Sequence, residues 1–272
     1  MQELRLKKNE DRRIRMGHLW IFSNEVDTKA TPLKEFEPGQ SAWITDWRGK
    51  PLAVGYVNPV SLISCRILSR NPGQDLNVAF FQSRLSQALD LRRRIRKTPF
   101  YRLVHGEGDL LPGLVIDRFG DIFSIQANTA GMDRFLPLIL ESLNRLLSPR
   151  GILLKNDSQA RHLEGLDQAV STIGSVPEEV MVEEEGARFI TSLSSGQKTG
   201  FYYDMSDMRI RSAAWAGAGQ VLDVFSYVGV FGVRAALAGA KHVTCVDSSR
   251  NALDYALENA RINKVADRME VQ

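Results

Sequence analysis

The 272-residue sequence predicts a multidomain α/β protein with a β-barrel-like unit, a central α+β unit and an incomplete Rossmann-like unit. Three observations predict this class. Short alternating strands fill the first part of the chain, strands and amphipathic helices share the middle, and a strand–turn–helix–strand pattern stands near the end. The chain is longer than one average domain. We therefore expect three domains, at residues 1–72, 73–180 and 181–272.

Short strands and tight turns are typical of the first predicted domain. The stretch SAWITDWRGKPLAVGYVN, residues 41–58, alternates apolar and polar positions around the hairpin turn Arg48-Gly49-Lys50. LISCRILS, residues 62–69, continues as another strand, and NPGQD at 71–75 is a turn-rich boundary. The pattern predicts a compact β unit.

The charge of the chain is distributed unevenly. A formal net charge of +3 is too small to indicate a nucleic-acid partner by itself. However, residues 1–16 hold six Lys/Arg against three acids, and residues 84–102 hold seven against the single Asp90. Trp20 and Phe22 follow the first basic stretch. This combination favours RNA binding, although a solvated surface and a packed aromatic core fit the same residues.

The second predicted domain mixes helices and strands. Apolar spacing predicts helices over 79–95 and 132–147. Glycine-rich turns divide residues 101–128 into three short strands, and GILLKND at 151–157 reads as one more. The segment is therefore expected to form an α+β module.

A hairpin and a βαβ unit characterise the third predicted domain. VMVEEEGARFIT, residues 180–191, turns near Glu185-Gly186, and GQKTGFYYDMSDMR leads into a helix over 204–216. The βαβ unit follows as a buried parallel strand at 221–225, a helix at 233–238, a strand at 242–246 and a helix at 250–262 capped by Ser248 or Ser249.

The turn after the first parallel strand lies where open α/β sheets bind ligands. Asp247 follows Asp223 at a spacing close to the roughly 20 residues that bring a carboxylate to a ribose. The turn carries Ser226, Tyr227 and Gly229 but lacks the G-x-G-x-x-G pattern that seats a pyrophosphate. These residues favour S-adenosylmethionine over a dinucleotide, and an ordinary βαβ unit with chance acids is the alternative.

GQKTGFYYDMSDMR followed by VLDVFSYVGVFGVRAALAGA resembles the RlmI-like class I S-adenosylmethionine-dependent ribosomal RNA methyltransferases. MGHLWIFSNEV is similar to the start of their N-terminal PUA domain, and HGEGDLLPGLVIDRFGD to their central domain. The resemblance implies 5-methylcytosine formation in large-subunit (23S) rRNA, with S-adenosylmethionine as cofactor and ribosomal RNA as partner. It implies that the segment 196–204 closes over the cofactor.

By this resemblance, Asp223 is expected near the methionine amino group of the cofactor and Asp247 at its ribose. The full set of expected cofactor-binding residues is Gln197, Lys198, Thr199, Phe201, Tyr202, Asp204, Arg209, Asp223, Phe225, Ser226, Tyr227, Gly229, Asp247 and Ser248. Core packing is an alternative role for Phe201, and a solvated surface position is one for Lys198.

Catalytic residues are not evident in this sequence. The family continues with an Asp-Pro-Pro-type motif and a cysteine-bearing motif, because C5 methylation begins with thiolate attack on C6. Cys65 and Cys245 lie in predicted core strands, and the four histidines show no metal-ligand spacing. We expect the C-terminal part of the catalytic domain to be absent, this chain alone to be inactive, and its sheet edge to pair with another chain or to destabilise it.

The remaining expectations concern setting and alternatives. No segment approaches the roughly 18 apolar residues of a membrane span, and the charged N-terminus is no secretory signal. A cytoplasmic protein without membrane contact is expected, and the family's dimers leave a homodimer open. A non-catalytic RNA-binding protein with a methyltransferase remnant is the alternative function. A nucleotide-dependent oxidoreductase is disfavoured by the missing phosphate loop.

Overall fold

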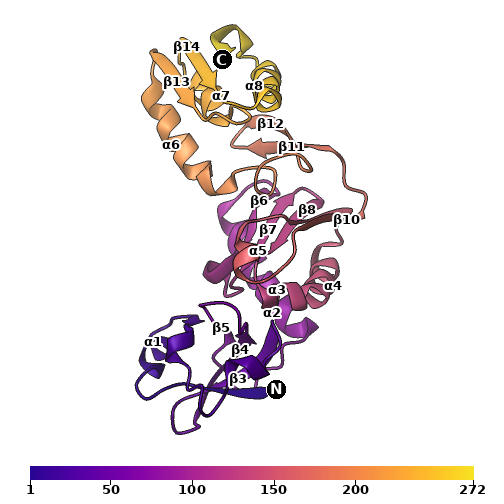
Figure 1. Ribbon diagram of the computed structural model, residues 1–272. Helices are drawn as coiled ribbons and strands as arrows, with labels where there is room; N and C mark the ends of the chain where they lie inside the picture. Colours follow the sequence, from indigo (N-terminus) through magenta and orange to yellow (C-terminus); the bar gives the residue numbers. More distant parts are fainter. The chain divides into compact units, whose positions relative to one another are not determined.

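The computed structural model describes residues 1–272. Its contacts divide the chain into two compact units, Met1–Lys97 with Arg102–Ser175 and Thr98–Tyr101 with Val176–Gln272 (Figure 1). The first unit holds two five-stranded sheets. The second holds a two-stranded hairpin and a three-stranded sheet.

The N-terminal sheet has the strand order β1-β3-β4-β5-β2. The predicted hairpin around Gly49 is present as β3 and β4, which pair antiparallel. The charged N-terminus, for which the sequence predicted no element, forms β1 parallel to β3 because Leu4 and Leu6 enter the core. The elements are β1 (Gln2–Arg5), α1 (Asp11–Arg15), β2 (Trp20–Ile21), η1 (Ser23–Glu25), η2 (Leu33–Glu35), β3 (Gln40–Thr45), β4 (Pro51–Val57) and β5 (Cys65–Ser69).

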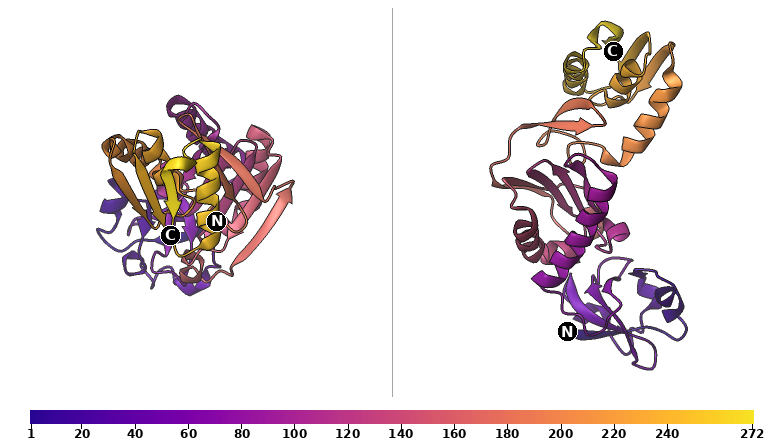
Figure 2. Two further views of the ribbon diagram at one scale, coloured as in Figure 1. Left: turned by 90° about the horizontal axis from the view of Figure 1, so that it is seen from above. Right: turned by 180° about the vertical axis from the view of Figure 1, so that it is seen from behind.

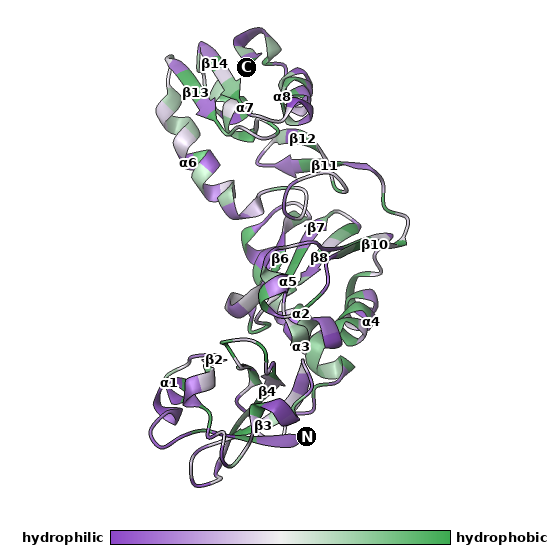
Figure 3. Ribbon diagram, in the orientation of Figure 1, coloured by the Kyte–Doolittle hydropathy of each residue, from purple (hydrophilic) through white to green (hydrophobic).

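The central sheet has the order β10-β9-β8-β7-β6, with β8 and β9 parallel. The helix predicted over 132–147 is divided into α3 and α4, since Pro137 stands in the first turn of α4 and cannot donate a backbone hydrogen bond. Figure 3 shows the mixed colouring of an amphipathic α4. The elements are α2 (Val78–Ile95), β6 (Phe100–His105), η3 (Gly106–Asp109), β7 (Leu114–Phe119), β8 (Ile122–Ala127), α3 (Ala130–Arg134), α4 (Leu136–Leu147), β9 (Gly151–Asn156), α5 (Ala160–Leu163) and β10 (Ala169–Gly174).

The two sheets of the first unit share a buried contact region. The Tyr56 hydroxyl donates to the carbonyl oxygen of Pro112 at 2.8 Å. Gly131 is required here, because a Cβ atom at that position would lie 2.1 Å from the Tyr56 ring. Glu164 accepts hydrogen bonds from Asn58 and Arg66, at 2.8 and 2.7 Å. These contacts fix the N-terminal sheet against the central segment.

The second unit begins with the antiparallel hairpin β11–β12 and continues into a parallel sheet of order β13-β14-β15 (Figure 2). Ser249 caps α8, its hydroxyl accepting from the N–H of Ala252, as the sequence predicted. The elements are β11 (Glu179–Glu184), β12 (Ala187–Ser192), η4 (Tyr203–Met205), α6 (Ser206–Ala216), β13 (Gln220–Val224), α7 (Val230–Leu237), β14 (His242–Val246), α8 (Arg250–Ile262), η5 (Ala266–Arg268) and β15 (Met269–Val271).

The expectation that residues 221–225 form a buried strand is wrong. Leu222 is 65% exposed and Val224 is 48% exposed. The strand is parallel to its neighbour, as predicted, but it lies at the edge of the sheet and pairs only with β14. An apolar run indicates that a strand tends to be buried, but it does not indicate how many other strands pair with it. No helix of the structure combines the length and the apolar run that a membrane-spanning segment needs.

Candidate functional site

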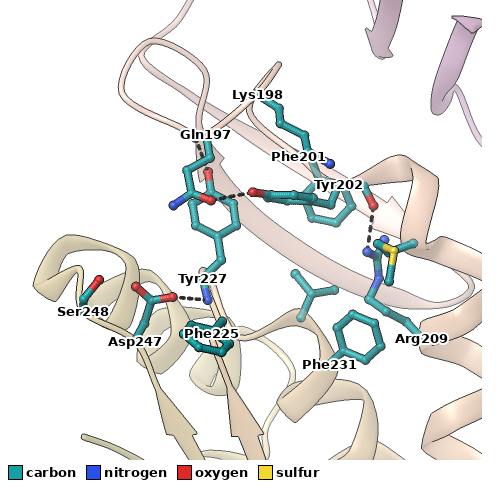
Figure 4. A pocket seen from close by; sticks show the side chains of 12 residues that line it. Gln197, Lys198, Phe201, Tyr202, Arg209, Phe225, Tyr227, Phe231, Asp247 and Ser248 are labelled. Atoms are coloured by element: carbon teal, nitrogen blue, oxygen red, sulfur yellow. Dashed lines mark hydrogen bonds between the residues drawn. The ribbon is translucent and has the colours of Figure 1, made fainter. Parts of the chain in front are cut away.

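A pocket of about 500 Å³ lies in the second unit, at the C-terminal ends of β13 and β14 (Figure 4). The segment before and within α6 forms its other side. Its lining is mixed, with aromatic and aliphatic side chains beside a few charged ones. The lining residues are Gln197, Lys198, Phe201, Tyr202, Met205, Arg209, Phe225, Tyr227, Val230, Phe231, Asp247 and Ser248.

Asp247 follows β14 directly and is held by two backbone groups. Its Oδ2 accepts the N–H of Tyr227 at 2.8 Å, and its Oδ1 accepts the N–H of Ser249 at 2.9 Å. A carboxylate has about four acceptor positions, so each oxygen retains capacity for a ligand hydroxyl. The parallel pairing of β13 and β14 brings Asp247 beside the turn that follows β13.

The turn after β13 has an uncommon backbone. Phe225 and Tyr227 both have positive φ, at 61° and 49°, a region that L side chains rarely adopt. This conformation leaves Phe225 89% exposed at the pocket and directs the N–H of Tyr227 to Asp247. Strained backbone of this kind often marks a functional site.

Tyr227 joins this turn to the segment 196–204. Its hydroxyl accepts the N–H of Gln197 at 3.2 Å and donates to the carbonyl oxygen of Gly200 at 3.1 Å. The Tyr202 ring meets the Tyr227 ring edge-on, with centroids 5.5 Å apart. The Tyr202 hydroxyl donates to Gln197 Oε1 at 2.5 Å (Figure 4). Burial raises the pKa of both tyrosines, so both hydroxyls stay protonated donors at neutral pH.

Lys198 is paired within the same segment. Its Nζ lies 3.1 Å from the Asp204 carboxylate and 4.2 Å from the centre of the Tyr202 ring. Lys198 lines the pocket, whereas the carboxylate that partly neutralises it does not. The ion pair thus places a cation over an aromatic ring at the pocket.

Arg209 is buried and holds the segment 196–204 in place through hydrogen bonds. Its Nη2 contacts Glu184 Oε1 at 2.5 Å, and its Nη1 donates to the carbonyl oxygen of Tyr202 at 2.8 Å. The guanidinium also lies 5.0 Å from the Phe201 ring. Glu184 receives a second arginine, Arg234 of α7, and its side chain is only 7% exposed. Phe201 was expected either at the cofactor or in the core, and it is buried and also lines the pocket.

Several predicted residues lie outside the lining. Asp223 Oδ2 accepts the N–H of Gly232 at 2.9 Å, and the residue lines an adjacent groove of about 380 Å³ with Trp215 and Leu222. Burial raises the pKa of the Asp223 carboxyl, and the negative charge of Asp247 adds to the shift.

The other predicted residues outside the lining have packing roles or buried positions. Gly229 is needed because its Cβ would lie 2.6 Å from the Cβ of Ala256 on α8, so it brings two helices together. Thr199 and Ser226 are buried beside the pocket, and Asp204 is the exposed partner of Lys198. Their assignment to the cofactor stays a prediction.

Three lining residues were missed in the sequence: Met205, Val230 and Phe231. All are apolar and flank the predicted motifs, Met205 after the Tyr-Tyr-Asp element and the other two directly after Gly229. A flat ligand needs apolar surfaces as well as polar contacts. This adjacency to Gly229 and Asp204 is the signal that could have identified them.

Neither cysteine is suited to nucleophilic attack. Cys65 and Cys245 are fully buried, and burial raises the pKa of each thiol to about 12. A thiolate is the reactive form, so both are inert at neutral pH. No group of three or more His, Cys, Asp or Glu side chains is placed to hold a metal ion.

Residues 4–70 match a family described as PUA-like domain, and residues 137–270 match one described as S-adenosylmethionine-dependent methyltransferase. Ribosomal RNA large subunit methyltransferase I of Cronobacter sakazakii is 34% identical over 265 residues, which cover 96% of this chain and 66% of that protein. The protein of the same name from Klebsiella pneumoniae is 35% identical over 263 residues, 95% of this chain and 65% of that protein. The chain thus spans about 65% of the length of these relatives.

Two solved structures share the fold over the whole chain. A candidate S-adenosylmethionine-dependent methyltransferase from Streptococcus mutans has a TM-score of 0.81 at 20% identity, and the match covers 70% of that chain. A candidate methyltransferase complexed with SAH has a TM-score of 0.82 at 20% identity and is covered to 69%. At this identity the likeness shows the fold, and it confirms the predicted class with a Rossmann-like unit after a PUA-like one.

Proposed function

The chain belongs to the RlmI-like S-adenosylmethionine-dependent methyltransferases, as its motifs predicted, and we propose that it binds S-adenosylmethionine in the pocket at the ends of β13 and β14. The observation that carries the proposal is the position of Asp247 beside the turn 225–229, opposite the segment that carries Gln197 and Tyr202. The pocket volume lies within the roughly 300–1,000 Å³ of small-molecule sites.

The residues present fit this cofactor. Asp247 retains acceptor capacity for two vicinal ribose hydroxyls, and Phe231, Val230 and Met205 offer apolar surface to a flat base. The exposed ring of Phe225 at the pocket suits a cationic group. We propose that the ionised Asp223, in the adjacent groove, attracts the amino group. When bound, S-adenosylmethionine supplies a methyl group on a positively charged sulfur.

We further propose that the protein acts on ribosomal RNA of the large subunit and forms 5-methylcytosine. The named activity of the curated relatives and the PUA-like match at residues 4–70 support an RNA substrate. Methylation at C5 needs a thiolate that attacks C6. Since both thiols of this chain are buried and protonated, we propose that neither Cys65 nor Cys245 is that nucleophile. Residues 1–272 alone then bind cofactor without methylating RNA.

The domain boundaries and the setting are part of the proposal. We propose domains at 1–72, 73–180 and 181–272, and the division of contacts near Ser175 supports the last boundary. We propose that the protein acts in the cytoplasm, together with the ribosomal RNA that is its proposed substrate. A homodimer is compatible with this function.

The test is a calorimetric titration of S-adenosylmethionine into the 272-residue chain and into Asp247→Ala. Loss of a charged hydrogen-bond acceptor costs about 1.5–3 kcal/mol, so we expect the affinity to fall about 10- to 100-fold. Asp254→Ala is the matched control, because Asp254 is an exposed carboxylate of α8 that pairs only with Arg250.

Equal affinity of Asp247→Ala and wild type would contradict the ribose role of Asp247. Absence of binding to a folded wild-type chain would contradict the cofactor proposal and favour an RNA-binding protein without catalysis. NADH serves as the comparison ligand, and we expect it not to bind, because the turn after β13 lacks the glycines that seat a pyrophosphate.

A further inference from the structure

In the turn between β3 and β4 the acidic side chain is buried, whereas the aromatic and basic side chains are exposed. Asp46 is buried, and its Oδ1 accepts the N–H groups of Arg48 and Lys50 at 2.9 and 3.0 Å. These hydrogen bonds, with that from Lys50 as the larger effect, lower the pKa of Asp46 and keep it ionised. The carboxylate therefore stabilises the turn from inside, while Trp47, Arg48 and Lys50 remain exposed.

Trp47 carries two cations on its ring. The Arg48 guanidinium lies 4.5 Å from the ring centroid, and Lys8 Nζ lies 5.6 Å from it. The indole nevertheless keeps 40% of its surface exposed. We call the four exposed residues Lys8, Trp47, Arg48 and Lys50 the Trp47 surface.

The cations of the Trp47 surface differ from their neighbours in pairing. Arg5, Arg13 and Arg15 each form an ion pair with a carboxylate, those of Glu3, Glu25 and Asp11. Neither the Lys8 ammonium nor the Arg48 guanidinium forms an ion pair with a carboxylate, and both lie against the indole. Positive charge that no carboxylate neutralises therefore lies directly beside this exposed aromatic ring.

We propose that the Trp47 surface binds single-stranded RNA, with a base against the indole and phosphates at Lys8, Arg48 and Lys50. Stacked aromatics beside cations are the combination by which proteins bind unpaired nucleotides. The proposal rests on RNA as the substrate class of the proposed function, but it concerns residues distant in sequence from the cofactor pocket.

The aromatic ring distinguishes RNA from a purely acidic partner. An acidic peptide would meet the cations and gain little from the indole. A nucleotide gains from both, since base stacking on an aromatic side chain contributes about 1–3 kcal/mol and phosphate contacts depend on salt. Trp47 and Arg48 therefore make separable contributions that an experiment can distinguish.

The experiment measures fluorescence anisotropy of a labelled oligouridine RNA of roughly 12 nucleotides with the full chain, at about 50 to 200 mM KCl. We expect Trp47→Ala to weaken binding about 5- to 100-fold and Trp47→Phe to retain most of it. For Lys8→Ala and Arg48→Ala, the slope of log affinity against log salt is expected to fall by about 0.7 for each phosphate that the variant no longer neutralises.

Two controls match these variants. Trp215→Ala removes another exposed tryptophan, 80% exposed on α6, and Lys34→Ala removes an exposed cation of the N-terminal sheet domain that is followed in sequence by Glu35. Both should bind like wild type. Thermal melting of every variant identifies a loss of binding that comes from unfolding.

The outcomes separate this inference from the proposed function. A wild-type chain that binds no RNA at low salt would overturn both the RNA partner and the Trp47 surface. Wild-type binding that is unchanged in Trp47→Ala and Arg48→Ala would overturn the surface and leave the RNA partner standing. Weaker binding on removal of the charges, with no change on removal of the indole, would overturn the stacking of a base on Trp47 and with it the proposal.

Discussion

Each compact unit contains a buried glutamate that pairs with arginine, but the two glutamates hold different segments together. In the first unit, Glu164 accepts from Asn58, Ser61 and Arg66 and fixes the N-terminal sheet to the central segment. In the second, Glu184 binds Arg209 and Arg234 and fixes the segment that carries Tyr202 to the hairpin β11–β12.

The two ion pairs differ in the other contacts of their arginines. Arg66 is enclosed by its own unit, whereas Arg209 lines the pocket and holds the carbonyl oxygen of Tyr202. A buried arginine–glutamate pair is therefore a purely structural interaction in one region and positions the lining of a pocket in the other. Burial and pairing alone do not distinguish these roles, and the neighbours of the arginine do.

The largest expected effect comes from Glu184→Ala, with Glu164→Ala as its matched control. Each leaves a buried guanidinium unpaired, which costs about 3–5 kcal/mol, and Glu184→Ala leaves two. In urea unfolding we expect both variants to be destabilised, Glu184→Ala the more. Calorimetry on the folded variants should show that S-adenosylmethionine binding disappears for Glu184→Ala alone. An equal effect on binding in Glu164→Ala would remove the distinction.

Asp223→Asn is expected to separate stability from binding. The folded-state pKa of Asp223 is raised by burial, so its contribution to stability is present below the unfolded pKa of about 3.9 and is lost as pH rises through the folded pKa. At pH 7 the variant should be the more stable protein, with the gain disappearing below about pH 4. Its cofactor affinity should fall about 10- to 100-fold, since an amide attracts the ammonium group weakly.

The test of this variant combines urea unfolding at several pH values with calorimetry at pH 7. A variant less stable than wild type at pH 7 would show that the Asp223 carboxylate is stabilised by a group other than Gly232. Unchanged cofactor affinity would show that Asp223 does not meet the amino group.

The smallest expected effect concerns Tyr227→Phe. The substitution removes the hydroxyl that contacts Gln197 and Gly200 but keeps the ring against Tyr202. Removal of such hydrogen bonds costs about 0.5–1.5 kcal/mol, so we expect cofactor affinity to fall about 2- to 10-fold and the segment 196–204 to be cleaved faster in limited proteolysis. Tyr255→Phe, which removes a hydroxyl bound to Glu179, should change neither.

The sequence alone predicted most elements of the second unit, although not β15, and most residues of the pocket lining. Local patterns and the geometry of parallel strands account for the helix cap at Ser249, the parallel βαβ unit and the contact of Asp247 with the turn at Tyr227. The motif GQKTGFYYD indicated that Gln197, Phe201 and Tyr202 belong to the same site.

Only the tertiary structure decided which residues line the pocket and which pack in the structure around it. Arg209, which was expected to support the cofactor, forms an ion pair with Glu184. Gly229, which was expected at the ligand, allows the close approach of Ala256. The exposure of β13 and the entry of β1 into the N-terminal sheet also depended on strand neighbours far apart in the chain. Periodicity specifies which face of an element is apolar, but the partner that covers this face is chosen by long-range packing.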